Sequence, residues 1–221
     1  MYDLPSRTTT HPCSVLALRR GEARLPVNGH TSAYSGGVAQ LQEIAREVGT
    51  DERTLRRAVQ LGTVRCVRPS PRKLALADGE REYLRTHLGL VDALRRALRT
   101  EPTVRLAVIY GSVARGDDRP DSDVDLLVSL REDRPATAVK LAVRLGRALG
   151  REVDVARLGR VERRSPLLLL QALDEGRVVI DRDDEWRALR TRRPLVARRA
   201  RAAHTALCRR AADAVEELVK D

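Results

Sequence analysis

A glycine–serine turn between two apolar runs places the strongest constraint on the fold of this chain. Residues 104–110 form an apolar run that predicts a strand, Gly111 and Ser112 follow directly, and a second strand is predicted over 123–130. Alternate side chains share one face of a strand, so Asp123 and Asp125 are expected to project together. A turn that leaves a strand and enters a helix supplies backbone N–H groups and a hydroxyl for an anion.

The two aspartates predict a cation site beside this turn. Neighbouring carboxylates repel each other unless a cation lies between them, and such oxygen ligands suit Mg²⁺ or Mn²⁺, which also bind phosphate oxygens. The bland alternative is a solvated turn. Asp125, however, leads directly into Leu126, Leu127 and Val128, a buried-strand pattern in which an unpaired carboxylate is costly. A phosphate-binding turn next to a metal-binding pair indicates a nucleotide site.

Residues 111–128 resemble the signature of the polymerase-beta-type nucleotidyltransferases. Gly-Ser-x-Ala-Arg-Gly is followed, after a short spacer, by Ser-Asp-x-Asp-Leu-Leu-Val. The chain is most similar to the minimal nucleotidyltransferase branch, whose members often act as antitoxins. Residues 165–181 also resemble the helix and closing strand of such proteins, so the resemblance covers residues 90–182. Several parts agree in order and spacing, whereas a lone Asp-x-Asp would be a weak signal.

The resemblance implies a fold and a set of site residues. The fold is α+β, a mixed, largely antiparallel sheet with helices packed on one side, preceded here by a small helix-turn-helix domain. The family expects a third carboxylate on a neighbouring strand, which Asp154 supplies between Val153 and Val155. The implied catalytic residues and metal ligands are Asp123, Asp125 and Asp154. The implied nucleotide-binding residues are Gly111, Ser112 and Arg115; Asp117, Asp118 and Asp121 are expected to be solvated or capping residues of the loop.

The resemblance also implies an activity. A nucleoside monophosphate passes from a nucleoside triphosphate, with ATP the first candidate, to a hydroxyl, and pyrophosphate leaves. Acceptors in the family include protein hydroxyls, antibiotics and RNA ends, and an antitoxin-like member modifies a partner toxin. Two alternatives remain open: a DNA-binding transcriptional regulator with a nucleotide-sensing or partner-binding transferase fold, and a module that neutralises a toxin by binding alone.

Residues 38–87 predict a module of another kind. Ile44-Ala-Arg-Glu-Val-Gly-Thr-Asp-Glu-Arg-Thr-Leu-Arg-Arg-Ala-Val59 resembles a helix-turn-helix with a glycine in the turn. Residues 63–68 and 73–76 are expected to form a wing-like hairpin. The alternative is a helical protein-contact module. Side chains suited to phosphates and base edges of an operator lie on the second predicted helix: Arg53, Thr54, Arg56, Arg57 and Gln60.

Composition limits the remaining segments. Residues 1–37 lack periodicity and are expected to be disordered, residues 88–182 to form the transferase domain, and residues 183–221 to form an arginine-rich helical segment broken at Pro194. Residues 78–100 predict two helices that meet near Gly89. The net charge of +11 is spread along the chain and is mild evidence for nucleic acid. Three scattered cysteines and the lack of a membrane-length apolar run predict a cytoplasmic protein, and no histidine is assigned a role.

Overall fold

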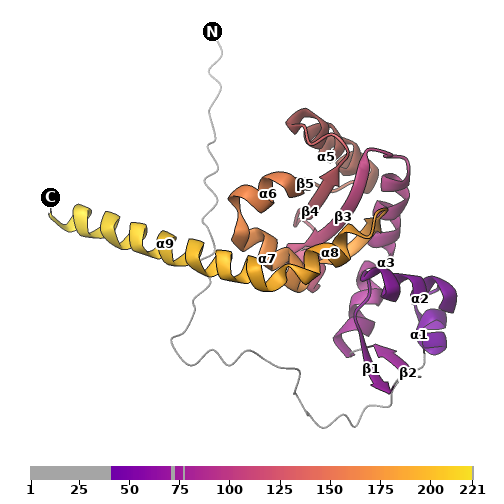
Figure 1. The fold of residues 1–221 in the computed structure, drawn as a ribbon. Helices are drawn as coiled ribbons and strands as arrows, with labels where there is room; N and C mark the ends of the chain where they lie inside the picture. Colours follow the sequence, from indigo (N-terminus) through magenta and orange to yellow (C-terminus); the bar gives the residue numbers. More distant parts are fainter. Residues whose placement is uncertain (1–40, 71–72, 77, 221) are drawn as a thin grey trace. The chain divides into compact units, whose positions relative to one another are not determined.

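The computed structural model describes residues 41–70, 73–76 and 78–220 (Figure 1). The segment 1–37, expected to be disordered, lies outside the described residues. A four-stranded mixed sheet organises the larger part, in the order β5-β4-β3-β6. β3 pairs antiparallel with both β4 and β6, and β4 pairs parallel with β5. The strands are β3 (Val104–Tyr110), β4 (Val124–Leu130), β5 (Val153–Arg157) and β6 (Arg177–Asp181). The predicted α+β class with a mixed sheet is confirmed.

Helices cover both faces of this sheet, not one face as the sequence led us to expect (Figure 1). Ala107 and Ile109 of β3 pack with one set of helices, whereas Leu106 and Val108 pack with the other. The physical reason is that β3 is apolar on both faces, so both must be covered to remove them from water. The first face carries α3 (Asp78–Arg99) and α5 (Pro135–Leu149); the second carries α6 (Leu158–Arg164), α7 (Pro166–Glu175) and α8 (Glu185–Thr191).

Two short helices and a hairpin precede the sheet. Gly49, with φ 71°, forms the turn between the helices, and Asp51 caps the second by accepting a hydrogen bond from the Thr54 amide at 2.8 Å. Ile44 and Leu55 are buried with Leu84 of α3 in a core of their own. The helices α1 (Leu41–Glu47) and α2 (Glu52–Leu61) and the strand β2 (Lys73–Leu76) occupy the predicted positions. The strand β1 (Cys66–Ser70) begins three residues later than the predicted segment 63–68.

A single 22-residue helix, α3, occupies the segment that predicted two helices. Gly89 has no backbone reason to end it, since a glycine inside a helix costs only about 1 kcal/mol relative to alanine. Both halves of α3 are anchored by packing. Leu84 belongs to the core of α1 and α2, whereas Val91 and Leu94 belong to the sheet core. This continuous burial outweighs the weak helix preference of one glycine.

The chain ends in α8 and a long helix, α9 (Arg193–Lys220). Pro194 lies in the first turn of α9, where a backbone N–H group would have no intrahelical partner. The predicted break at Pro194 is therefore the boundary between α8 and α9. Val196 and Ala200 are buried, whereas most later side chains as far as Glu217 are exposed. Among the described residues, no helix combines the length and the apolarity needed to cross a bilayer.

Candidate active site

Two acidic side chains and a tyrosine occupy one row across three strands. Tyr110 of β3 pairs with Asp125 of β4, and Asp125 pairs with Asp154 of β5. Residues paired directly across a sheet share a face, so the two carboxylates are neighbours on the face that α6 and α7 cover. Asp125 is the second residue of β4 and is only half-buried, whereas the residues on either side of it are buried. The predicted juxtaposition of a β4 carboxylate with Asp154 is therefore present in the strand register.

The three acidic residues differ in exposure. Asp125 is half-buried, whereas Asp154 is exposed and Asp123 lies exposed just before β4. Burial, followed by the charges of Asp154 and Asp123, raises the pKa of Asp125 to about 6. Burial and the carboxylates of Asp125 and Asp154 also raise the pKa of the Tyr110 hydroxyl. The row thus concentrates negative charge that a cation would compensate.

The donor set suits a hard divalent cation, because carboxylate oxygens are the ligands that Mg²⁺ and Mn²⁺ prefer. In the described part of the chain, no three His, Cys, Asp or Glu side chains come together closely enough to hold a metal ion. Asp125 and Asp154 are the pair that the sheet itself fixes, and Asp123 approaches from the loop before β4. The strands thus place side by side two carboxylates of the kind that such a cation prefers.

The turn after β3 contacts Asp125 directly. Gly111 has φ 73°, a conformation that favours glycine, and a Cβ at this position would clash with Asp125 Oδ2. The short helix α4 (Gly111–Arg115) follows and ends at Gly116, whose amide donates to the Ser112 carbonyl at 2.8 Å. Only a glycine permits this close approach, so the turn and the carboxylate form one site. Ser112 is half-buried beside it.

Glu175, the last residue of α7, contacts this turn, although no role was predicted for it. Its Oε1 accepts hydrogen bonds from the Gly111 amide at 2.8 Å and from Gln171 Nε2 at 2.7 Å. Both its carboxylate oxygens also accept from Arg115 Nη1 at 3.1 Å. The antiparallel pairing of Ile109 with Arg177 is what brings Glu175 next to Gly111. That register could have revealed the contact, whereas the local sequence contains no signal for it.

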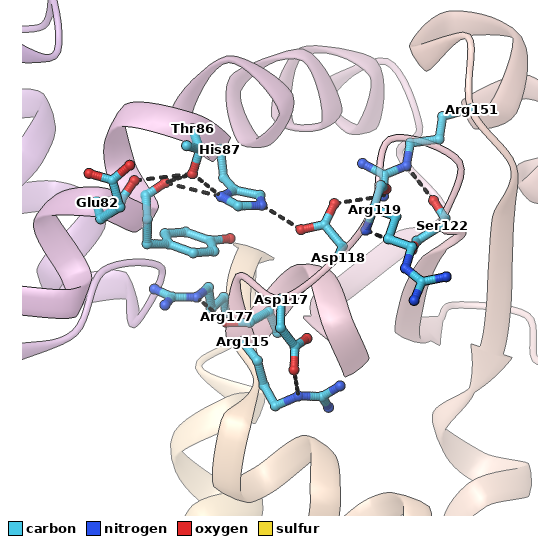
Figure 2. A network of polar contacts seen from close by, with 12 residues as sticks. Glu82, Thr86, His87, Arg115, Asp117, Asp118, Arg119, Ser122, Arg151 and Arg177 are labelled. Carbon is cyan, nitrogen blue, oxygen red and sulfur yellow. Dashed lines mark hydrogen bonds and ion pairs between the residues drawn. The ribbon is translucent and has the colours of Figure 1, made fainter. Parts of the chain in front are cut away.

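Arg115 extends toward solvent and carries two acidic partners. In addition to Glu175, its Nε donates to Asp117 Oδ2 at 3.0 Å (Figure 2). The hydrogen bond to Asp117 is the largest contribution that raises the pKa of Arg115, so the side chain stays cationic. An exposed guanidinium beside the Gly111 turn is suited to a phosphate group.

Asp118 is not the solvated loop residue that the sequence led us to expect. His87 Nε2 lies 2.6 Å from Asp118 Oδ1, and Arg151 Nη2 donates to Asp118 Oδ2 at 2.7 Å (Figure 2). Burial raises the pKa of Asp118, but the hydrogen bonds from His87 and Arg151 outweigh it and hold the pKa below its ordinary value. His87, to which no role was assigned, therefore fixes the end of the turn.

The comparisons with known proteins concern this region. Residues 92–185 match the family model described as polymerase beta, nucleotidyltransferase. These residues form a polymerase-beta-type nucleotidyltransferase domain. The match begins within α3 and ends at the start of α8, so it contains the nucleotidyltransferase sheet, the Gly111 turn and all three predicted aspartates. No curated protein matches the chain.

The nucleotidyltransferase domain also has similar solved structures. A toxin–antitoxin complex with AMP-PNP matches with 20% identity and a TM-score of 0.47, over 55% of this chain and 97% of the other. A tri-AMPylated Shewanella oneidensis HEPN toxin in complex with MNT antitoxin matches with 18% identity and a TM-score of 0.45, over 57% and 98%. No conclusion about substrate or partner follows from likeness at this level.

The residues predicted to contact DNA lie outside the nucleotidyltransferase domain, on α2. Arg53, Arg57 and Gln60 are exposed, and Arg56 is exposed but forms an ion pair with Glu52 at 2.6 Å. Thr54 is half-buried, and its hydroxyl donates to Asp51 Oδ2 at 2.7 Å as part of the helix cap. The exposed face of α2 is thus basic, whereas Thr54 has a structural contact.

Proposed function

We propose that the domain transfers a nucleoside monophosphate from a nucleoside triphosphate, with ATP as the first candidate, to a hydroxyl. The acceptor oxygen forms a bond to the α-phosphorus, the bond from that phosphorus to pyrophosphate breaks, and the hydroxyl proton leaves. The observation that carries the proposal is the direct pairing of Asp125 with Asp154 beside a glycine turn that packs on Asp125. The family match over residues 92–185 supports the reaction class.

The three aspartates divide the work in this proposal. Asp125 and Asp154, with Asp123 approaching from the loop before β4, would hold Mg²⁺ or Mn²⁺, which would supply positive charge for the phosphate oxygens of the transition state. Asp154 is the more exposed carboxylate of the pair and would accept the proton of the acceptor hydroxyl. Asp125 must be ionised to act as a ligand, and its raised pKa means that protons compete with the cation for this carboxylate as the pH falls toward about 6.

The Gly111 turn binds the phosphates in this proposal. The Gly111 amide and Arg115 are the donors at the site, with the Ser112 hydroxyl beside them. The Gly111 amide and Arg115 both donate to Glu175 in this structure, so a bound phosphate would compete with the Glu175 carboxylate for these donors. The turn therefore has groups of the right kind for an anion, and Glu175 moderates its affinity.

The acceptor that we propose is a protein hydroxyl on a partner toxin. The support is the resemblance of residues 111–128 to the minimal nucleotidyltransferases, many of which are antitoxins. The exposure of Asp154 fits a large acceptor, because a protein side chain can reach an acid at the surface more easily than a buried one. A gene for a small helical protein next to the gene for this chain would supply the candidate substrate.

The test is calorimetric titration of ATP, GTP, CTP and UTP with Mg²⁺ into the wild-type protein and the Asp125→Asn variant. We expect Mg²⁺-dependent binding of one nucleotide in the wild type and its loss in the variant. Asp121→Asn, an exposed aspartate of the same loop, is the matched control and should bind as the wild type does. Nucleotide transfer by Asp125→Asn at the wild-type rate would contradict the proposed role of Asp125.

DNA binding by α2 is a second candidate function, favoured by its exposed and unpaired Arg53 and Arg57. Among the described residues neither has an ion-pair partner, so both are available to phosphates. Replacing each with alanine should weaken operator binding and reduce the slope of log K against log salt by about 1 per residue. If the wild type binds no nucleotide yet binds DNA, the alternative of a non-enzymatic regulator is the better account.

A further inference from the structure

Arg177, the first residue of β6, is a buried cation at the centre of several elements. Its side chain is 2% exposed and forms an ion pair with Glu80 of α3, which is 3% exposed. Arg177 Nη2 donates to Glu80 Oε2 at 2.9 Å, and the guanidinium carbon lies 3.3 Å from the centre of the Tyr83 ring. A buried ion pair is weak evidence for stability, because desolvating both charges offsets much of their attraction. A contribution to stability is therefore a poor explanation for a buried arginine at this position.

The reason lies in the remaining donors of Arg177. Its Nε donates to the Ala114 carbonyl at 2.6 Å, inside α4. The last carbonyls of a helix lack intrahelical partners, and α4 is a single turn, so this contact satisfies a group that the turn itself cannot. Arg177 Nη1 donates to the Thr63 carbonyl at 3.2 Å, two residues after α2. One guanidinium thus joins the Gly111 turn to α3 and to the end of α2.

The rest of the turn is held from the same side. Tyr83 stacks on His87 with their ring centres 4.5 Å apart. Figure 2 shows the contact of His87 with Asp118. A Cβ on Gly116 would lie 3.2 Å from Tyr83 Cδ2, so the end of α4 also packs closely on this ring. Residues 116 and 118 of the turn therefore contact Tyr83 and His87 of α3, and Arg177 links residue 114 to Glu80 of the same helix.

The geometry points to Arg177 as a positioning residue for nucleotide transfer, which fixes the Gly111 turn through the Ala114 carbonyl. This inference rests on the proposed function of the turn as the phosphate site. Arg177 touches no reacting atom; it holds the backbone that does. The same side chain binds the Thr63 carbonyl, so the placement of the turn depends on the segment that follows α2.

Thr63 strengthens that dependence through β6. The Val178 amide donates to the Gly62 carbonyl at 3.2 Å, and the Thr63 hydroxyl donates to the Val178 carbonyl. The segment after α2 is therefore bonded to the backbone of β6 immediately beside Arg177. A displacement of α2 would be transmitted to the Gly111 turn through two residues of one strand.

The experiment compares Arg177→Met with Arg95→Met. Arg95 is a matched control, because it also bonds to β6 and Thr63, through the Val179 carbonyl at 3.4 Å and Thr63 Oγ1 at 3.2 Å, but makes no contact with the turn. Hydrogen exchange of the amides of residues 111–118 is measured without nucleotide. We expect faster exchange there in Arg177→Met and wild-type exchange in Arg95→Met. Fluorescence of Trp186, the single tryptophan, reports whether each variant is folded.

A kinetic readout accompanies the exchange measurement. Misplacing a binding loop weakens the substrate complex, so the KM for the nucleotide should rise about tenfold in Arg177→Met and change less than about twofold in Arg95→Met. Equal exchange of residues 111–118 in both variants would overturn the inference. A wild type that transfers no nucleotide would instead contradict the proposed function, while the exchange comparison would still decide the role of Arg177.

Arg177→Lys covers the case in which the methionine variant does not fold. Lysine keeps a buried cation next to Glu80 but lacks the planar fork that reaches Glu80 and the Ala114 carbonyl together. The lysine variant should therefore be folded and still show faster exchange at residues 111–118. Exchange identical to the wild type in Arg177→Lys would show that the Ala114 contact does not position the turn.

Discussion

Asp154 lies directly across from Asp125 in the parallel pairing of β4 with β5. After burial, its charge is the largest influence on the pKa of Asp125, ahead of the charge of Asp123. The pair therefore consists of Asp125, whose pKa is raised, and the more exposed Asp154, whose charge causes part of that increase.

Asp154→Asn should lower the pKa of Asp125 from about 6, but not to its ordinary value, because burial remains. NMR titration of the Asp125 carboxyl in the absence of divalent cations measures the change. Asp123→Asn should cause a smaller decrease, since its charge contributes less. An unchanged Asp125 pKa in Asp154→Asn would mean that the two carboxylates do not interact through the sheet.

Asp125→Asn should stabilise the fold at neutral pH although it should also abolish nucleotide transfer. The folded state raises the Asp125 pKa and so favours the protonated form. The resulting penalty is absent below about pH 4, grows as the pH rises, and is complete above about pH 6. After allowance for solvent screening of a half-buried group, we expect a gain of about 1–2 kcal/mol in the free energy of unfolding at pH 8.

Urea denaturation at pH 4 and pH 8, with a chelator present, checks this expectation. The two proteins should have similar stability at pH 4, where Asp125 is protonated, and should differ at pH 8. A variant that is less stable than the wild type at pH 8 would show that the ionised Asp125 has a favourable partner in the folded protein.

Gly111→Ala should impair both stability and nucleotide binding. The φ of 73° costs an alanine about 1–2 kcal/mol, and its Cβ would also displace Asp125 Oδ2. Gly150→Ala is the matched control, because Gly150 has φ 63° but no atom within 4 Å of the added Cβ. Calorimetry should show lost nucleotide binding only for Gly111→Ala. Loss in both variants would trace the effect to general backbone strain.

Glu175→Gln should strengthen nucleotide binding. The substitution removes a negative charge that accepts hydrogen bonds from the Gly111 amide and Arg115, and it also removes an influence that raises the Asp125 pKa. A gain on the order of 1 kcal/mol corresponds to about a fivefold lower Kd for the nucleotide. Asp174→Asn, which affects an exposed ion pair with Arg193, should leave the Kd unchanged. Weaker binding by Glu175→Gln would show that Glu175 supports the turn instead of competing with phosphate.

The sequence predicted the parts of the site that lie within one segment. Gly111 and Asp125 belong to a local signature whose spacing is visible in the chain. The family resemblance implies a third carboxylate on a neighbouring strand, and the valines on either side of Asp154 mark that strand. The mixed sheet followed from the same resemblance. Local spacing sufficed for Gly111 and Asp125 because both lie within one short segment of the chain.

The features that the sequence missed depend on contacts between distant segments. Glu175 reaches Gly111 only through the register of β3 with β6, and Arg177 meets Glu80 across 97 positions of sequence. Helices on both faces of the sheet follow from burial of β3, which a family resemblance did not convey. A break in α3 was predicted at Gly89 because helix propensity is a local property. The continuity of α3 depends instead on the packing of both its halves.

The continuity of α3 determines how this protein can be divided in the laboratory. A fragment that starts at residue 88 would lack Glu80, leaving Arg177 as a buried charge without its acidic partner, and a fragment that ends at residue 87 would lose the rest of the helix that carries Leu84. Neither fragment would keep its native interior. Expression plasmids for the catalytic half should therefore begin before Asp78, and the half that contains α1 and α2 is best studied by substitution within the intact chain.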